Sequence, residues 1–356
     1  MQAKEMTDGV HVPDTLKIPN SGVLSRSLGR LIKPVVTNYL LIVLVAIVVF
    51  GYFLSPYFLT SRNIGNVLTF AAVVSVIAVG QFFVIVTGGI DLSVGSIVAL
   101  STVVAAVGMK NGMPPFVASV LALLVSGAFG SISGLLVVKA RIAPFVATLA
   151  MMSIGRGSSY LVQVGSLISI SDEGFIHFFA GKTGIIPNPV ILFVSVMLVS
   201  AFFMQFSTFG RRLYAIGGNT EAARLSGLPV TEATFSVYML SGLLSGLAGL
   251  ILAAQLTQGS SLLAQGYELD AIAAVVVGGA SLSGGTGNPL KAVVGGLIIA
   301  VIGNIMNLMT IPSEPQLVVK GILIIIAVVF IGGKTQPRLF RKRTLVRRSR
   351  ASCDND

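Results

Sequence analysis

Residues 64–87 read IGNVLTFAAVVSVIAVGQFFVIVT, and residues 92–109 read LSVGSIVALSTVVAAVGM. Neither run contains a charged residue, and each is close to the roughly 20 apolar residues that a membrane-spanning helix needs. Only the four residues Gly88-Gly89-Ile90-Asp91 separate them. This stretch decides the fold class, because two such neighbouring segments have to lie in lipid. The short connection also allows a broken pair of helices.

The same pattern recurs along the chain and predicts an all-α polytopic membrane protein. Of the 356 residues, 54% are hydrophobic and only 10% are charged, whereas an ordinary soluble domain has about 25% charged residues. So few charges cannot cover a soluble globule of this length. We predict ten spans, at about residues 34–54, 64–87, 92–109, 115–138, 143–164, 187–206, 233–256, 268–281, 290–309 and 315–332.

The eighth predicted span, 268–281, is the shortest and has Glu268 and Asp270 at its start. It is either a short tilted helix or a re-entrant segment.

An even number of spans places both termini on one side of the membrane. With the termini in the cytosol, most of the 24 Lys and Arg residues fall on inner segments, as the positive-inside rule requires.

The predicted organisation is a polar cytoplasmic segment (1–33), a transmembrane permease domain (34–332) and a basic cytoplasmic tail (333–356). The net charge of +11 is concentrated in these two ends. Nucleic acid is not an expected partner, because aromatic residues other than Phe340 do not interleave with the basic ones. We expect the tail to contact anionic membrane lipid.

Motifs for nucleotide binding and catalysis are missing. Gly181-Lys182-Thr183 and Gly333-Lys334-Thr335 end like a P-loop, but Ile176 and Val328 stand where that motif needs its first glycine. The chain has two His and one Cys, and no cluster with metal-ligand spacing. We therefore expect no catalytic residue, no metal and no bound cofactor, and we do not expect an enzyme.

The acidic residues near the spans lie at their ends, where water is expected to be close. Asp91 either caps a helix that begins at Leu92-Ser93 or takes part in transport. Because proton- and sodium-coupled carriers usually need an acid within the membrane, the scarcity of such acids favours an external energy source. A self-sufficient secondary carrier or channel is the alternative.

The longest predicted inner loop, about 207–232, contains the signals of a short helix. Asn219 or Thr220 can cap its start, Glu221 falls in its first turn, and Gly227 ends it. A helix of this kind in a cytosolic loop is either a docking peg for a soluble partner or a surface helix without one. We expect a bulky residue at Gly217 or Gly218 to disturb the loop before this helix.

Two further patterns concern packing. Small residues recur at close spacing within two spans, which indicates close helix contacts inside the bundle or, alternatively, at a subunit interface. Residues 87–95 also resemble residues 277–285, which indicates an internal duplication or a chance match of glycine-rich sequence. The small residues of the first pattern are Ser126, Gly127, Gly130 and Gly134 in the span 115–138, and Ser241, Gly242, Ser245, Gly246 and Gly249 in the span 233–256.

Three blocks identify a family resemblance. They are TGGIDLSVGS (87–96), YAIGGNTEAARLSG (214–227) and YELDAIAAVVVGGASLSGGTG (267–287). In this order they resemble permease subunits of the ribose-type branch of binding-protein-dependent ABC importers, over about residues 35–332. The resemblance implies a type II-like permease bundle in the bacterial inner membrane that transports a monosaccharide or related polyol.

The resemblance also implies three protein partners: a cytosolic ABC ATPase that binds the ATP, a periplasmic sugar-binding protein, and a second permease copy in a homodimer or heterodimer. It places ATPase coupling on one loop and the translocation path or gate on two others. The implied coupling residues are Gly217, Gly218, Asn219, Thr220, Glu221, Arg224 and Gly227. The implied path or gate residues are Gly88, Gly89, Asp91, Ser93, Glu268, Asp270, Gly278 and Gly279.

Overall fold

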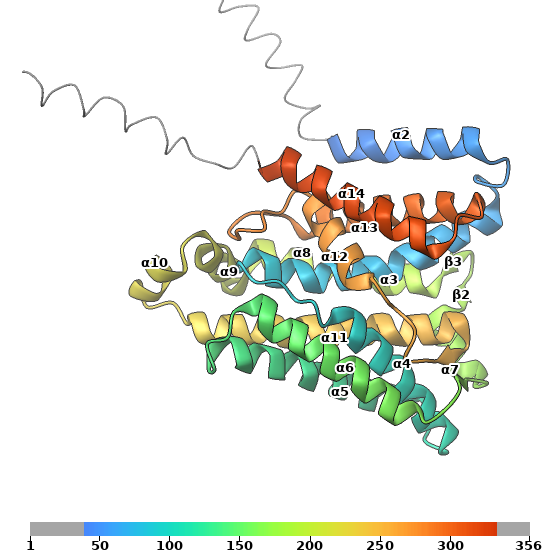
Figure 1. The fold of residues 1–356 in the computed structure, drawn as a ribbon, viewed down its shortest axis with the longest axis horizontal. Helices are drawn as coiled ribbons and strands as arrows, with labels where there is room; N and C mark the ends of the chain where they lie inside the picture. The colour runs from blue at the N-terminus through green and yellow to red at the C-terminus, as the bar shows by residue number, and fades with distance from the viewer. Residues whose placement is uncertain (1–38, 333–356) are drawn as a thin grey trace, which may run out of the picture.

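The computed structural model describes residues 39–332, and these form a single bundle of helices (Figure 1). The predicted segment 1–33 and tail 333–356 lie outside the described residues. The first helices are α2 (Tyr39–Leu54), α3 (Ser61–Val86), α4 (Val94–Lys110), α5 (Pro115–Val138), α6 (Pro144–Gln163) and α7 (Glu173–Ala180). They are followed by α8 (Asn188–Phe206), α9 (Thr208–Gly218), α10 (Thr220–Leu225), α11 (Val230–Leu256), α12 (Tyr267–Val277), α13 (Pro289–Leu308) and α14 (Ser313–Gly332).

Short strands pair at one end of the bundle. Strand β1 (Ile168–Ser169) pairs antiparallel with β4 (Gln258–Gly259), and β2 (Lys182–Thr183) pairs antiparallel with β3 (Ile186–Pro187). Helix α7 lies at this end, whereas α9, α10 and the turn between α5 and α6 lie at the other (Figure 1). The predicted inner loop 207–232 and the segment 165–186, which carries α7 and three of the short strands, are therefore at opposite ends of the bundle.

The helices confirm the predicted fold class, and most begin and end within a turn of a predicted span. Five of the described helices are long and apolar enough to cross a membrane by length and composition: α3, α5, α8, α11 and α13. Helices α2 and α4 are apolar but shorter. The count of ten spans and the cytosolic termini remain predictions.

The eighth predicted span differs from the structure, because α12 has only 11 residues. At about 1.5 Å per residue it cannot cross a hydrocarbon core about 30 Å thick. It ends where the N–H of Gly279 donates to Val276 O (2.8 Å) and that of Ala280 to Val275 O (3.2 Å). Gly279 has a φ of +89°, which closes this Schellman ending. The segment is thus a helix of about three turns that is too short to be the predicted eighth span by itself, and its expected re-entrant form remains a prediction.

Helix α3 ends in the same way. The N–H of Gly88 donates to Ile85 O (2.9 Å) and that of Gly89 to Val84 O (3.1 Å), and the φ of Gly88 is +85°. In the two endings Gly88 corresponds to Gly279, whereas the similar sequences align Gly88 with Gly278. The two segments therefore end their helices in the same way. The sequence match between 87–95 and 277–285, however, is shifted by one residue from the alignment that the two helix endings give.

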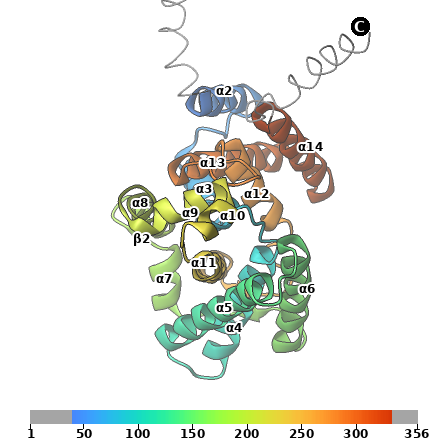
Figure 2. The same ribbon diagram turned by 90° about the vertical axis from the view of Figure 1, so that its left-hand side faces the viewer.

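Helix α11 lies at the centre of the bundle, between α3 and α5 (Figure 2). Its small residues face those of α5, which confirms the expected close contact inside the bundle. A Cβ added at Gly242 would lie 2.5 Å from Ser126 O and 2.9 Å from the Cα of Gly130. Backbone atoms meet here, so neither helix can carry a larger side chain at this crossing.

We expect Gly242→Ala to destabilise the chain by about 1–3 kcal/mol, because the added methyl group overlaps the backbone of α5. The measurement is the melting temperature of the purified chain in detergent. The control is Gly157→Ala on α6, where a Cβ meets nothing within 4 Å. Equal melting temperatures for the two variants would contradict the crossing described here.

Candidate functional site

The three motif blocks meet in one place, although more than 100 residues separate the first from the second. The N–H of Gly285, in the third block, donates to Val86 O at the end of α3 (2.9 Å). A Cβ added at Gly217, in the second block, would overlap that same carbonyl and lie 2.5 Å from the N of Gly285. A Cβ at Gly284 would lie 2.9 Å from the N of Gly88. We call Val86, Gly88, Gly217, Gly284 and Gly285 the glycine junction.

The glycine junction depends on backbone that other residues adopt poorly. Gly284 and Gly285 have φ values of +87° and +74°, in the left-handed region where glycine is the ordinary residue. Beside them, the Tyr214 hydroxyl donates to Gly287 O (2.9 Å) and attaches α9 to the same loop. The C-terminal half of α9 is therefore held against two helix connections at once.

The predicted inner loop contains two helices rather than one. Ser207 caps α9, because its hydroxyl accepts the N–H of Gly210 (3.1 Å). Asn219 caps α10 by accepting the N–H of Ala222 (2.9 Å), as expected from the sequence. The pair Gly217-Gly218 ends α9 instead of forming a loop before a helix, since Asn219 starts the next helix at once.

The outer surface of α10 is exposed. Glu221 lies in its first turn and forms an exposed ion pair with Arg224 (3.4 Å). Leu225, at the end of α10, is 81% exposed. Gly227, with a φ of +75°, turns the chain away from the helix. A Cβ at Gly218 would meet nothing within 4 Å, so Gly218 differs from its neighbour Gly217.

Asp91 lies beside the glycine junction and is 0% exposed. Its Oδ1 accepts the N–H and the hydroxyl of Ser93 (3.0 and 2.6 Å), and its Oδ2 accepts the hydroxyl of Ser241 on α11 (2.8 Å). With the Gln81 amide assigned in the orientation that satisfies both of its groups, its nitrogen donates to the backbone carbonyl of Asp91 (3.0 Å) and its oxygen accepts the Asp91 N–H (3.2 Å). Helix α3, the loop before α4 and helix α11 are thus joined at Asp91.

Two expectations about Asp91 are wrong. It does not cap α4, because the helix begins at Val94 and the backbone N–H that Asp91 accepts belongs to Ser93, before the first turn. Nor is it near water, because α11 covers it. The carboxylate instead connects the loop between α3 and α4 to α11.

Glu268 and Asp270 lie in the first turn of α12 and have different surroundings. Asp270 is 1% exposed, contrary to the expected nearness of water, and it accepts a bond from Lys320 Nζ on α14 (2.8 Å). The Glu268 carboxylate packs against Gly95 at the start of α4. The Arg156 guanidinium donates to Ser261 O (2.7 Å) and Leu263 O (2.8 Å) in the segment leading to α12.

The structure therefore divides the expected gate residues. It places Gly88, Gly89, Asp91 and Ser93 beside the glycine junction, and Glu268 and Asp270 at the start of α12. The pair Gly278-Gly279 has other neighbours. A Cβ at Gly278 would lie 2.6 Å from Lys291 O, and one at Gly279 would lie 2.9 Å from the Tyr39 hydroxyl.

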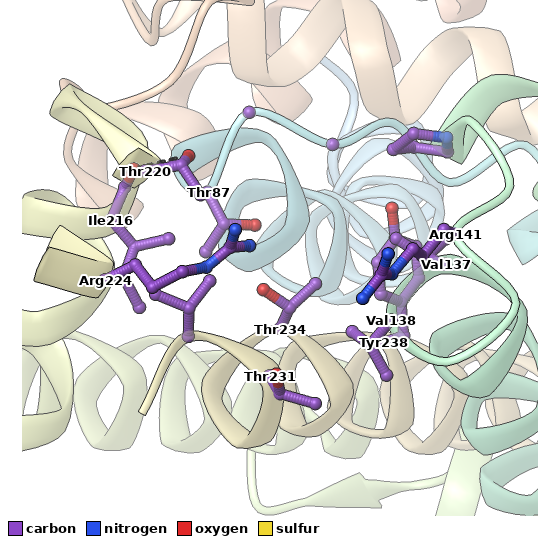
Figure 3. Close-up of a pocket in the computed structure, with 14 residues that line it drawn as sticks. Thr87, Val137, Val138, Arg141, Ile216, Thr220, Arg224, Thr231, Thr234 and Tyr238 are labelled. Atoms are coloured by element: carbon purple, nitrogen blue, oxygen red, sulfur yellow. Dashed lines mark hydrogen bonds between the residues drawn. The ribbon is translucent and has the colours of Figure 1, made fainter. Parts of the chain in front are cut away.

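A cavity of about 680 Å³ lies between the glycine-rich loop after α3, the helix α10 and the turn between α5 and α6. Figure 3 shows the Arg141 and Arg224 side chains pointing into it from opposite walls. Its lining residues are Thr87, Gly88, Gly89, Val137, Val138, Arg141, Pro144, Ile216, Thr220, Arg224, Val230, Thr231, Thr234 and Tyr238.

Sequence reasoning missed several residues of this site. Gly284 and Gly285 stand in the third block but were not singled out, although a run of glycines after a short span was a usable signal. Ser241, Gln81 and Arg141 have no local signal, because each acquires its role from segments distant in sequence.

The comparisons with known proteins agree with the three motif blocks. A family model described as the branched-chain amino acid transport system permease component matches residues 63–328. The ribose import permease protein RbsC of Bacillus subtilis is 43% identical over 297 residues, covering 83% of this chain and 90% of that protein. No solved structure gives a significant match.

Two further relatives come from Escherichia coli K12. The D-allose transport system permease protein AlsC is 40% identical over 293 residues, which cover 82% of this chain and 89% of that protein. The L-arabinose transport system permease protein AraH is 35% identical over 275 residues, which cover 77% and 84%. The family model and the relatives together show that the chain belongs to the family of transport-system permease components that its motif blocks indicate.

Proposed function

We propose that this chain is the membrane-spanning permease subunit of an ABC importer for a monosaccharide or related polyol. The ATPase that drives it is a separate cytosolic subunit, and a periplasmic binding protein delivers the sugar. The observation that carries the proposal is the glycine junction, which joins the proposed coupling helices α9 and α10 to the ends of two membrane helices. The relatives named for ribose, allose and arabinose import support the substrate class.

The proposal assigns the end of the bundle with α9 and α10 to the cytosol. Helix α10 presents Glu221 and Leu225 outward, and an exposed apolar side chain beside a charged one is available for contact with a protein partner. When the docked ATPase moves α10, the connected helix α9 moves with it. Because Gly217 lies against Val86 and Gly285, the displacement reaches the ends of α3 and the loop after α12 without an intervening side chain.

Such a mechanism requires two states of the bundle that the ATPase contacts differently. The expected path or gate residues lie at or beside the glycine junction, so a movement of α9 would displace the loop that contains them. They are Gly88, Gly89, Asp91 and Ser93. A second copy of the permease completes the proposed transporter, as a homodimer or heterodimer. A self-sufficient carrier or channel is the competing proposal, and it needs no ATPase.

The test is reconstitution of the purified chain in liposomes, with and without the ATPase subunit that co-purifies from native membranes. We expect uptake of ribose or a related sugar only with the ATPase, ATP and the binding protein present. Uptake by the chain alone, without ATP, would overturn the proposal in favour of a self-sufficient carrier.

Gly217→Ala should abolish most sugar uptake while Gly218→Ala leaves it near the original rate, although the sequence alone gives both glycines the same expectation. The added methyl at Gly217 collides with backbone atoms of Val86 and Gly285, whereas at Gly218 it enters open space. Uptake and ATP hydrolysis are measured together in the assembled transporter. Equal transport by both variants would contradict the coupling assignment. So would a Gly217→Ala chain that no longer assembles with the ATPase, because the loss of uptake would then reflect a missing complex rather than lost coupling.

Glu221→Lys and Leu225→Ser should each weaken binding of the ATPase subunit by about tenfold. The first reverses the favourable charge in the first turn of α10, and the second removes an exposed apolar contact. Binding is measured by co-purification and titration in detergent. Glu314→Lys, at the start of α14 on the opposite end, makes the same charge change and serves as the control. If all three variants bind the ATPase subunit equally well, α10 is not part of the binding interface.

A further inference from the structure

The cavity beside α10 has a chemistry that the transport of a neutral sugar does not require. Two guanidinium groups enter it from opposite walls, as Figure 3 shows. Threonine hydroxyls lie between them, and no carboxylate is among its lining residues. A cavity with this lining attracts an anion rather than a neutral polyol.

Arg224 is available for a ligand. Its ion-pair partner is Glu221 at 3.4 Å, and the two side chains are 65% and 68% exposed. An exposed pair at this distance contributes little and is screened by salt. The guanidinium can therefore exchange this partner for a more strongly charged one without a large loss of free energy.

Arg141 occupies an unfavourable position in the turn between α5 and α6. Its φ is +56°, in the left-handed region that costs an ordinary residue about 1 kcal/mol or more. The turn is closed by the N–H of Ile142, which donates to Leu136 O (3.1 Å). Glycine would relieve the cost but would remove the cation, and strain of this kind concentrates at functional sites.

A third group is unpaired at the cavity. The Tyr238 hydroxyl is buried and has no hydrogen-bond partner among the described residues. Tyr238 lines the cavity together with Thr234 of the same helix. The site thus offers two cations and unused hydroxyl capacity, which together suit an anion that also has hydroxyl groups.

We propose that this cavity binds a phosphate monoester of a small sugar, with the phosphate between Arg141 and Arg224 and the sugar hydroxyls near Thr234 and Tyr238. A phosphate has close to two negative charges and three acceptor oxygens, and guanidinium groups bind such oxygens in pairs. The phosphate part rests on the cavity alone. The sugar part rests on the proposed function.

The proposed ligand places the site after the transport step. A neutral sugar delivered to the cytosol becomes this kind of ligand when a phosphotransferase moves the terminal phosphoryl group of a nucleoside triphosphate to one sugar hydroxyl, releasing the nucleoside diphosphate and the hydroxyl proton. A ligand held by both arginines would connect α10 to the turn between α5 and α6. The cavity would then respond to the phosphorylated product of the imported sugar.

The test is calorimetric titration of the full chain, without ATPase, in a zwitterionic detergent that has no phosphate group. The probes are ribose 5-phosphate, inorganic phosphate and ribose. We expect ribose 5-phosphate to bind most tightly, and Arg141→Gln and Arg224→Gln each to weaken it by about tenfold or more. Arg62→Gln, at the opposite end of α3, makes the same chemical change outside the cavity and should leave binding unchanged.

The outcomes separate the parts of the proposal. Ribose binding as tight as ribose 5-phosphate, or an equal loss in Arg62→Gln, would overturn the anion site. Equal affinity for inorganic phosphate and ribose 5-phosphate would support the phosphate site and overturn the sugar. Phosphatidic acid retained in native mass spectrometry and lost in Arg141→Gln, without binding of soluble phosphates, would assign the phosphate to a lipid headgroup. Because no step involves transport, none of these results depends on whether the importer assignment holds.

Discussion

The hydrogen bond from the N–H of Gly285 to Val86 O is the contact on which the proposed coupling depends. It joins two backbones directly, and it exists because Gly217 leaves the space that any Cβ would fill. A side-chain contact can absorb a displacement by changing rotamer, whereas packed backbones move together. Helix α9 is therefore packed against the end of α3 through backbone contacts, and in the proposed mechanism a push on α10 would be passed to α3 through these contacts.

Buried charges determine which parts of the bundle stay together during such a movement. A charge in the membrane interior is costly unless it is paired or hydrogen-bonded. Asp91 meets this cost through Ser93 and Ser241, and Asp270 meets it through Lys320. Breaking the hydrogen bonds of Asp91 or the ion pair of Asp270 would leave a buried carboxylate without a partner. This free-energy cost opposes separation of the loop before α4 from α11, and of α12 from α14. The pairs thus favour movement of these helices as units.

The spans were predictable because each is an apolar run of nearly fixed length, a property local in sequence. Helix α10 was predictable for the same reason, since Asn219 and Gly227 mark its ends. The length of α12 was not, because its ending depends on the left-handed φ of Gly279, and several glycines of that segment could have supplied it. The partners of Asp91 and Asp270 were also hidden: Ser241 and Lys320 are ordinary residues of apolar helices until the fold brings them near a carboxylate.

The proposal that ATP hydrolysis occurs on a separate subunit, and not along the translocation path, agrees with how the buried acids are held. Asp91 is held by two serine hydroxyls and Asp270 by Lys320, so these two buried carboxylates are poorly suited to titrate during each cycle, and we find no P-loop motif in the sequence. In the proposed mechanism the energy enters as a mechanical displacement from the ATPase, and α10 is an exposed helix connected through α9 to the glycine junction. The cationic cavity lies between α10 and the turn of Arg141, directly beside that connection. A ligand held there by both arginines would connect α10 to the turn of Arg141, so it would oppose or favour the proposed displacement itself.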